Sequence, residues 1–367
     1  RDIAVVQTDL TPGGAELVSL MQAKKLGADL YCSRNRLDGA FPEFAEEVEV
    51  HEYGRLVPDS VPLSGTLNAI HTALLRNSDF LEEYDVVVTH KNPAEVLGLR
   101  AKQNHGCRYV WYGHNVSEFI WGVWDNEESR FDQETVNPLV KAVYGFFGPL
   151  LRNVDRKAYE EADKVFANSE ATKQKFEERI GEREDLEVLY PPIRTFGDGE
   201  TEEERGEYAV TVGRVTPNKK TMDAVEACGR AGVDIHIAGS ISDEKYREEI
   251  EQVAEDHGIE AVFHGYVSDK ELGELVCSAR FGVMPSSNEN FGLTPLEMCG
   301  SGTPCFVREG CGVTEVYDKK LVFENIEDLS NRIESDREEL ENAAARIQEK
   351  IEGLNDRHFN KLEEVIA

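Results

Sequence analysis

The chain has 367 residues, of which 40% are hydrophobic, and a formal net charge of −31. This length suits two domains with sizeable cores, and no apolar stretch approaches the roughly 20 residues of a membrane span. The acidity argues against binding to nucleic acid, whose phosphates require clustered Lys and Arg.

Apolar, β-rich runs alternate with amphipathic segments along the first half, which predicts a parallel sheet with crossover helices. The chain begins with a strand pattern over residues 3–7 and not with a signal peptide, so we expect a cytoplasmic protein. Helical patterns include residues 15–26 and 93–103. Further strands are expected at 30–33, 48–53, 86–90, 109–112, 164–167 and 187–189.

The second half repeats the alternation, with strands expected at 208–212, 234–238, 261–264, 281–284, 304–307 and 321–323. Between the halves, Tyr190-Pro191-Pro192 cannot continue a helix or a central strand, and the polar stretch 195–206 is expected as a linker. We therefore predict doubly wound domains over 1–192 and 193–353. A long helical tail is expected over 326–367, with its last part, about 354–367, packing back on the first domain.

Three loops at predicted strand ends carry residues suited to ligand binding. Gly13 and Gly14 follow the first strand, where they let amides approach a phosphate or simply form a tight turn. Arg214 and Lys219 follow the first strand of the second domain and suit a diphosphate, although a solvated loop also explains them. His114 follows a strand of the first domain and can donate to a hydroxyl, assist proton transfer or have a structural role.

Two glutamates, Glu289 and Glu297, lie eight positions apart around the start of a predicted helix. The pattern from Thr294 to Glu297 predicts a capping box with Thr294 as the N-cap and Pro295 as the first helical residue. The presence of a glutamate at position 297 is explained by helix capping. It is also explained by acceptance of hydrogen bonds from two sugar hydroxyls, as in ribose binding. Glu289 precedes the helix, so it binds a ligand or is solvated. No Asp-x-Asp pair or ligand spacing indicates a metal.

Together these motifs resemble those of the retaining GT-B glycosyltransferases of family 4. They follow the family's order across nearly the whole chain, and the set is specific although each motif alone is weak. Cys305 and Cys311 depart from the residues common there, valine and glycine. The matching residues are Gly13-Gly14, His114, Asn168-Ser169, Gly213-Arg214 with Lys219, Ile237-Ala238-Gly239, His264-Gly265-Tyr266-Val267, Glu289 with Glu297, Gly302-Thr303-Pro304, and Gly312 with Glu315.

The resemblance implies a GT-B fold, in which two Rossmann-like doubly wound domains face a cleft. The first domain would bind the acceptor and the second a nucleotide sugar. Glu297 would bind the ribose, Glu289 would bind hydroxyls of the donor sugar, and His114 would lie near the transferred sugar. The diphosphate would be held by Arg214 and Lys219, with Gly14 allowing the first loop to approach. The amides of Phe291, Gly292 and Leu293 would contact sugar and phosphate.

The implied reaction transfers a hexosyl group from a nucleotide diphosphate sugar to a glycan or lipid-linked acceptor, with retention and without metal or cofactor. Its products would be cell-surface polysaccharides or glycoprotein glycans. A nucleotide-sugar epimerase, a phosphorylase or a non-catalytic sugar-binding protein are the alternatives. An epimerase usually lacks this pair of glutamates with the Gly-Arg-x4-Lys pattern, a phosphorylase typically carries a cofactor lysine, and a sugar-binding protein would carry an export signal.

Trp111, Trp121 and Trp124 fall in one short window, followed by an aromatic stretch over 144–152. This pattern suits peripheral contact with the inner face of the membrane or a lipid-linked acceptor, and the alternative is a core helix with an aromatic-lined wall. The acidity opposes strong binding to anionic lipid. Its even spread is typical of a halophilic protein, with an acidic mesophile protein as the alternative. The seven cysteines lack zinc spacing and are expected in cores.

Overall fold

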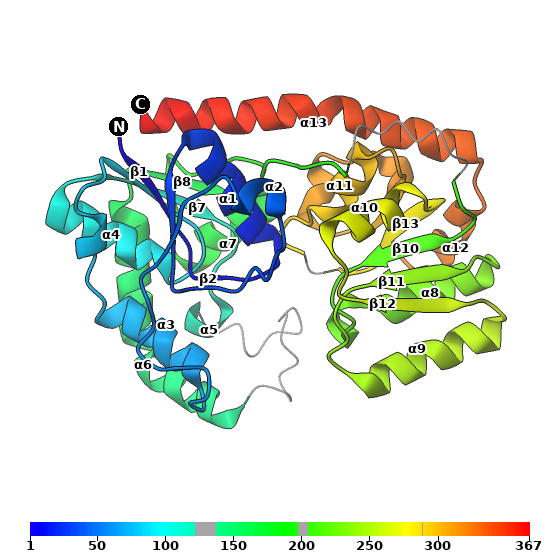
Figure 1. Cartoon of the computed structure of the whole chain (residues 1–367), viewed down its shortest axis with the longest axis horizontal. Helices are drawn as coiled ribbons and strands as arrows, with labels where there is room; N and C mark the ends of the chain where they lie inside the picture. Colours follow the sequence, from blue (N-terminus) through cyan, green and yellow to red (C-terminus); the bar gives the residue numbers. More distant parts are fainter. Residues whose placement is uncertain (122–136, 197–204, 288) are drawn as a thin grey trace. The chain divides into compact units, whose positions relative to one another are not determined.

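The computed structural model describes residues 1–121, 137–196, 205–287 and 289–367 (Figure 1). Two compact units are present, one formed by Arg1–Pro192 with Arg357–Ala367 and the other by Ile193–Asp356. Each has a parallel sheet flanked by helices, which confirms the predicted α/β class. The predicted linker 195–206 falls within the second unit, and residues 197–204 of it lie outside the described part.

The first unit contains a seven-stranded parallel sheet in the order β5-β3-β1-β6-β7-β8-β9. Its central strand β6 reads Val-Val-Val-Thr and is buried throughout, because helices cover both faces of a parallel sheet. The strands are β1 (Ile3–Val6), β3 (Asp29–Cys32), β5 (Val50–Glu52), β6 (Val86–Thr89), β7 (Arg108–Gly113), β8 (Lys164–Ala167) and β9 (Glu187–Val188). Two further strands, β2 (Asp9–Leu10) and β4 (Arg34–Asn35), pair with each other and are too short for the periodicity that predicts a strand.

The helices of the first unit alternate with these strands, as the pattern predicted. In α1, left-handed Gly27 (φ 60°) ends the helix, and its amide bonds the carbonyls of Ala23 and Lys24. The bounds are α1 (Gly14–Leu26), α2 (Pro42–Ala45), α3 (Ser64–Leu74), α4 (Ala94–His105), α5 (Glu118–Trp121), α6 (Pro138–Glu161) and α7 (Glu170–Arg179).

The second unit contains a six-stranded parallel sheet in the order β12-β11-β10-β13-β14-β15. Every strand predicted for this half is present. The strands are β10 (Ala209–Val212), β11 (Ile235–Ala238), β12 (Ala261–Gly265), β13 (Phe281–Met284), β14 (Cys305–Arg308) and β15 (Val322–Phe323). The α-helices that begin in this unit are α8 (Thr221–Arg230), α9 (Glu244–His257), α10 (Asp269–Cys277), α11 (Thr294–Gly300), α12 (Ile326–Ile333) and α13 (Arg337–Ile366).

The C-terminal tail, predicted to be helical over 326–367, consists of two helices, α12 and α13. The break lies at residues 334–336, where Asp336 accepts a hydrogen bond from the amide of Glu338 and caps the start of α13. The end of α13 belongs to the first unit, where His358, Leu362 and Ile366 are buried.

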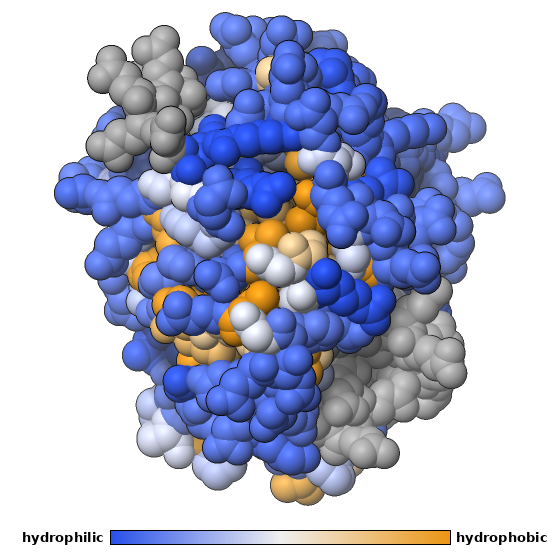
Figure 2. Space-filling model, turned by 90° about the vertical axis from the view of Figure 1, so that its right-hand side faces the viewer, coloured by the Kyte–Doolittle hydropathy of each residue, from blue (hydrophilic) through white to orange (hydrophobic). Residues whose placement is uncertain are grey.

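The surface and the cysteines agree with the composition. One face of the molecule is shown in Figure 2, and hydrophilic residues predominate on it. All seven cysteines are free, and all but the half-buried Cys277 are buried, as predicted for core residues. Among the described residues, no helix combines the length and the apolar character needed to cross a bilayer.

Two carboxyl groups are buried together between α4 and α6 of the first unit. Glu95 accepts from Asn92 Nδ2 at 2.5 Å, and Asp155 accepts from the indole nitrogen of Trp121. Burial raises the pKa of Glu95 well above its ordinary value and that of Asp155 to about 6, and the two groups hydrogen bond to each other. A shared proton therefore accounts for Glu95 Oε2 and Asp155 Oδ1, which otherwise lack a partner among the described residues.

We expect the Glu95→Gln variant to lose less stability than the wild type as the pH rises. The folded pair retains a proton that unfolded carboxyl groups release, so the free energy of unfolding falls between the ordinary carboxyl pKa and the raised ones. Glutamine still offers an N–H to Asp155 but has no proton to release. Melting temperatures measured from about pH 5 to about pH 8 test this. Glu160→Gln, on the exposed face of α6, is the control, and parallel curves for Glu95→Gln and wild type would contradict the shared proton.

Candidate functional site

The predicted site residues follow interior strands of the two sheets. In the first unit β1 lies between β3 and β6, and in the second β10 lies between β11 and β13. At β1 and at β10 the strand order changes direction, because the strands that follow in the chain are added on the other side. Parallel sheets bind ligands at the carboxyl ends of the strands next to such a reversal. Gly13-Gly14 and His114 follow β1 and β7, whereas Arg214 and Glu289 follow β10 and β13. Each unit therefore carries one group of predicted residues.

Lys219 and Glu289 form an ion pair in the second unit, although 70 positions separate them. Lys219 ends a short 3-10 helix (Pro217–Lys219) after β10, and Glu289 lies in the loop after β13. Their side chains are 29% and 21% exposed, so solvent and a ligand can reach both. Arg214 is exposed, and no described residue forms an ion pair or a hydrogen bond with its side chain.

Close backbone contacts hold the loop that carries Glu289. The amides of Gly312 and Val313 donate to the carbonyls of Glu289 and Phe291 at 3.2 and 2.8 Å. A Cβ on Gly312 would lie 2.0 Å from the Asn290 carbonyl oxygen, so only glycine permits this approach. The backbone position of Glu289 is therefore fixed by a segment more than twenty residues further along the chain.

The next predicted residues lead from this loop into α11. Phe291 is buried, Gly292 has a left-handed φ of 96°, and the half-buried Leu293 immediately precedes the helix. The predicted capping box is wrong, because α11 begins at Thr294 with Leu293 as its N-cap, and Leu293 has no polar side chain to cap the amides. Capping by Thr294 therefore does not explain Glu297.

Glu297 is paired with Arg194, a residue outside the predicted set. Arg194 Nε donates to Glu297 Oε1 at 2.8 Å, and its Nη1 lies 3.0 Å from Asp269 Oδ1. The Arg194 and Glu297 side chains are only 8% and 7% exposed. The guanidinium also stacks over Phe196, with 4.9 Å to the ring centroid. A lone cation two residues after Pro192 was the one available signal, and its partners are far away in the sequence.

In the first unit, Gly13 makes room for a buried carboxylate. A Cβ on Gly13 would lie 2.7 Å from Glu16 Oε2, and Gly14 begins α1. Glu16 is buried, accepts from Thr11 Oγ1 at 3.3 Å and pairs with Lys91 Nζ at 2.5 Å. The close packing at Gly13 is therefore explained by Glu16, while phosphate binding at the glycine pair stays a prediction.

His114 is almost fully buried, at 9% exposed, directly after β7. Its Nε2 lies 2.9 Å from His90 Nδ1, and the two rings stack with 5.2 Å between centroids. Burial, followed by the neighbouring His90, Lys91 and His358, holds the pKa of His114 well below its usual range. The imidazole is therefore neutral at pH 7.

For two of the three tryptophans, the structure agrees with the core interpretation. Trp111 is buried and meets Phe176 edge-on at 5.3 Å, and Trp121 is half-buried and donates to Asp155. Trp124 lies outside the described residues. Helix α6 nevertheless exposes three large apolar side chains, Leu139, Phe146 and Leu150.

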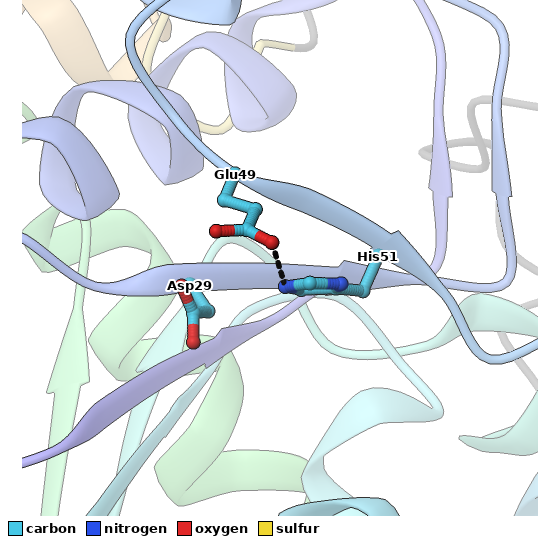
Figure 3. Close-up of side chains that lie close together, drawn as sticks. All are labelled: Asp29, Glu49 and His51. Carbon is cyan, nitrogen blue, oxygen red and sulfur yellow. Dashed lines mark ion pairs between the residues drawn. The ribbon is translucent and has the colours of Figure 1, made fainter.

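Figure 3 shows the one group of three metal-ligating side chains found in the described part of the chain, Asp29, Glu49 and His51. Their ligand atoms lie within 4.8 Å of one another. His51 Nε2 lies 3.5 Å from Glu49 Oε1, and Tyr84 donates to Asp29 at 2.5 Å. The group lies at the starts of β3 and β5, away from the carboxyl ends that carry the predicted site, so it does not bear on that site's chemistry.

Comparison with known proteins gives consistent matches in both halves. Residues 13–195 match the model of Glycosyltransferase Family 4, and residues 194–351 match that of Glycosyl transferases group 1. A GDP-mannose-dependent alpha-(1-6)-phosphatidylinositol dimannoside mannosyltransferase of Mycobacterium tuberculosis is 34% identical over 113 residues. That match spans 29% of this chain and only 28% of the relative.

Solved structures match over nearly the whole chain. HepE of Anabaena, in complex with UDP, has a TM-score of 0.74 at 18% identity, covering 99% of this chain and 100% of that one. Sucrose-phosphate synthase of Thermosynechococcus elongatus has a TM-score of 0.75 at 14% identity, covering 100% and 98%. At such identities these likenesses establish the fold.

Proposed function

The chain belongs to the GT-B glycosyltransferases of the family 4 type, and from that premise we propose that it transfers a hexosyl group from a nucleotide diphosphate sugar. The acceptor we propose is a glycan or a lipid-linked sugar. The observation that carries the proposal is the Lys219–Glu289 pair at the strand-order reversal of the second unit. A cation suited to phosphate and a carboxylate suited to sugar hydroxyls meet there, as a sugar phosphate requires.

The proposed donor complex rearranges this ion pair. The diphosphate takes hydrogen bonds from the Lys219 ammonium, which has three donors, and from the exposed Arg214 guanidinium. Glu289, thereby released, accepts hydrogen bonds from hydroxyls of the sugar. Glu297 binds the ribose while Arg194 holds its carboxylate in place.

In the proposed reaction the bond between the anomeric carbon and the leaving phosphate oxygen breaks, and a bond to the acceptor oxygen forms on the same face. The acceptor hydroxyl gives its proton to the departing phosphate, so the configuration is retained and the charges balance. Stabilising the leaving diphosphate is then the main catalytic contribution. Arg214 and Lys219 supply that stabilisation in our proposal, so no metal is required.

A screen of nucleotide sugars tests the function. We expect one UDP- or GDP-linked hexose to raise the melting temperature, because a ligand that binds only the folded state stabilises it. With that donor, hexose should be transferred to a glycan or lipid-linked acceptor in the presence of a chelator. High-salt buffer is used because the chain carries a charge of −31. The proposal fails if no UDP- or GDP-sugar shifts the melting temperature and none is consumed.

We further propose synthesis of cell-surface polysaccharide or glycoprotein glycan at the inner face of the membrane. The exposed apolar residues of α6 support this, above all Phe146, which is 80% exposed. Sedimentation with vesicles of phosphatidylcholine and phosphatidylglycerol provides the test. Wild-type protein should pellet with vesicles more than the Phe146→Ser variant, and equal pelleting would refute contact through this helix.

A further inference from the structure

A chain of hydrogen bonds runs through the interior of the first unit and ends at His114. It starts at the backbone carbonyl of Tyr190, 2.7 Å from His358 Nδ1. His358 Nε2 lies 3.1 Å from Gln22 Nε2, and Gln22 Oε1 lies 3.1 Å from His90 Nε2. His90 Nδ1 then meets His114 Nε2 at 2.9 Å. Gln22 and His358 are fully buried and His90 is almost so, which leaves little room for exchange with water.

The order of donors along this chain follows from its first member. A carbonyl oxygen can only accept, so His358 Nδ1 carries a proton. Burial lowers the pKa of His358 to about 4, so the ring is neutral and its Nε2 accepts from the amide NH2 group of Gln22. The amide oxygen of Gln22 therefore faces His90 and accepts from His90 Nε2–H.

The same reasoning continues to the end of the chain. Burial lowers the pKa of His90 to about 3, so this ring is neutral as well. Because His90 Nε2 carries its single proton, His90 Nδ1 is an acceptor, and His114 Nε2 must donate to it. His114 is neutral too, which leaves its lone pair on Nδ1.

We propose that Gln22, His90 and His358 are positioning residues that fix His114 in the Nε2–H tautomer, so that His114 acts on the sugar as a hydrogen-bond acceptor through Nδ1. The contact between His114 and the sugar rests on the proposed function, whereas the tautomer assignment is independent of that function. This replaces the expectation that His114 donates to a substrate hydroxyl, because its proton is already committed to His90. An acceptor at this place selects a ligand group with a hydrogen to donate, namely a hydroxyl.

The tautomer can be measured directly by NMR on protein with 15N-labelled histidine. Two-bond nitrogen–proton correlations distinguish the two neutral tautomers, and the His114→Asn spectrum identifies the His114 signals among the nine histidines. We expect a protonated Nε2 and an unprotonated Nδ1 on His114 near pH 7. If the wild-type spectrum shows a protonated Nδ1 or a doubly protonated ring on His114, the proposal is overturned without any variant.

Two variants of Gln22 test whether the chain sets this tautomer. Gln22→Glu keeps an acceptor for His90, so His114 should remain in the Nε2–H form. Gln22→Met removes that acceptor at similar volume, so His90 and His114 should show mixed tautomers. The signals of His236 and His264, which contact each other at 3.1 Å in the second unit, serve as a folding control. An unchanged His114 spectrum in folded Gln22→Met would refute the coupling.

Activity separates this inference from the proposed function. With the donor identified by the screen, Gln22→Met should lower kcat about 10-fold and Gln22→Glu should retain most of it, as for other residues that orient a ligand-contacting histidine. Unchanged kcat in a variant with a mixed tautomer would overturn the role at the sugar. If the tautomer is as assigned but no nucleotide sugar is used, the proposed function fails while the tautomer assignment stands.

Discussion

The Glu289→Ala variant should lose about 10²- to 10³-fold in the rate of sugar transfer while remaining folded, as expected when a preorganised polar contact to the reacting group is removed. The fold should persist because Lys219, left without its partner, is 29% exposed and can be hydrated. Exposed pairs of this kind contribute at most about 1 kcal/mol to stability. Steady-state kinetics together with a melting curve of the same sample measure both effects.

Glu309→Ala is the matched control for Glu289. Glu309 is exposed and, like Glu289, follows a strand of the second unit's sheet. Its replacement by alanine removes the same charge from the chain. Its kinetics should equal those of the wild type. Transfer by Glu289→Ala at the rate of Glu309→Ala would show that Glu289 does not contact the reacting sugar.

The Arg194→Met variant should be destabilised by about 3 to 5 kcal/mol, the usual cost of removing one partner of a buried ion pair. It leaves Glu297 and Asp269 without their cation, and their side chains are only 7% and 18% exposed. Chemical denaturation without any nucleotide sugar measures this free energy independently of catalysis.

The double variant Arg194→Met/Glu297→Gln measures the contribution of the Arg194–Glu297 ion pair to stability. If the cost comes from a stranded carboxylate, neutralising Glu297 should recover part of the lost stability, and the two effects will not add. Arg230→Met is the control, because Arg230 is 44% exposed and pairs with Glu226 one helical turn away. Equal losses in Arg194→Met and Arg230→Met would contradict the buried-pair explanation.

The fold was largely predictable because strands buried on both faces appear as short apolar runs. Val86–Thr89 and Phe281–Met284 are of this kind. The strand pair Asp9–Leu10 and Arg34–Asn35 was not predicted, because a strand of two residues is too short to show a hydrophobic alternation. The Thr294 capping box failed because Leu293 takes the N-cap position, a one-residue shift that composition alone does not decide.

The candidate site was predictable where motif residues follow adjacent strands. Lys219 and Glu289 meet because the sheet places β10 beside β13. Arg194 could not be predicted, because its partners Asp269 and Glu297 reach it only through tertiary packing. The same holds for Gln22 and His358, which are 336 positions apart and carry no motif. Such positioning contacts depend on which buried side chains become neighbours after folding.

The return of Arg357–Ala367 to the first unit has a consequence for synthesis on the ribosome. Domains generally fold in the order in which they emerge, but this first unit lacks His358, Leu362 and Ile366 until after all strands of the second have been made. A nascent chain halted before residue 357 therefore leaves apolar surface uncovered and Gln22 without His358. Chaperones and proteases recognise such surface, so translation arrest late in this chain should yield a species marked for degradation.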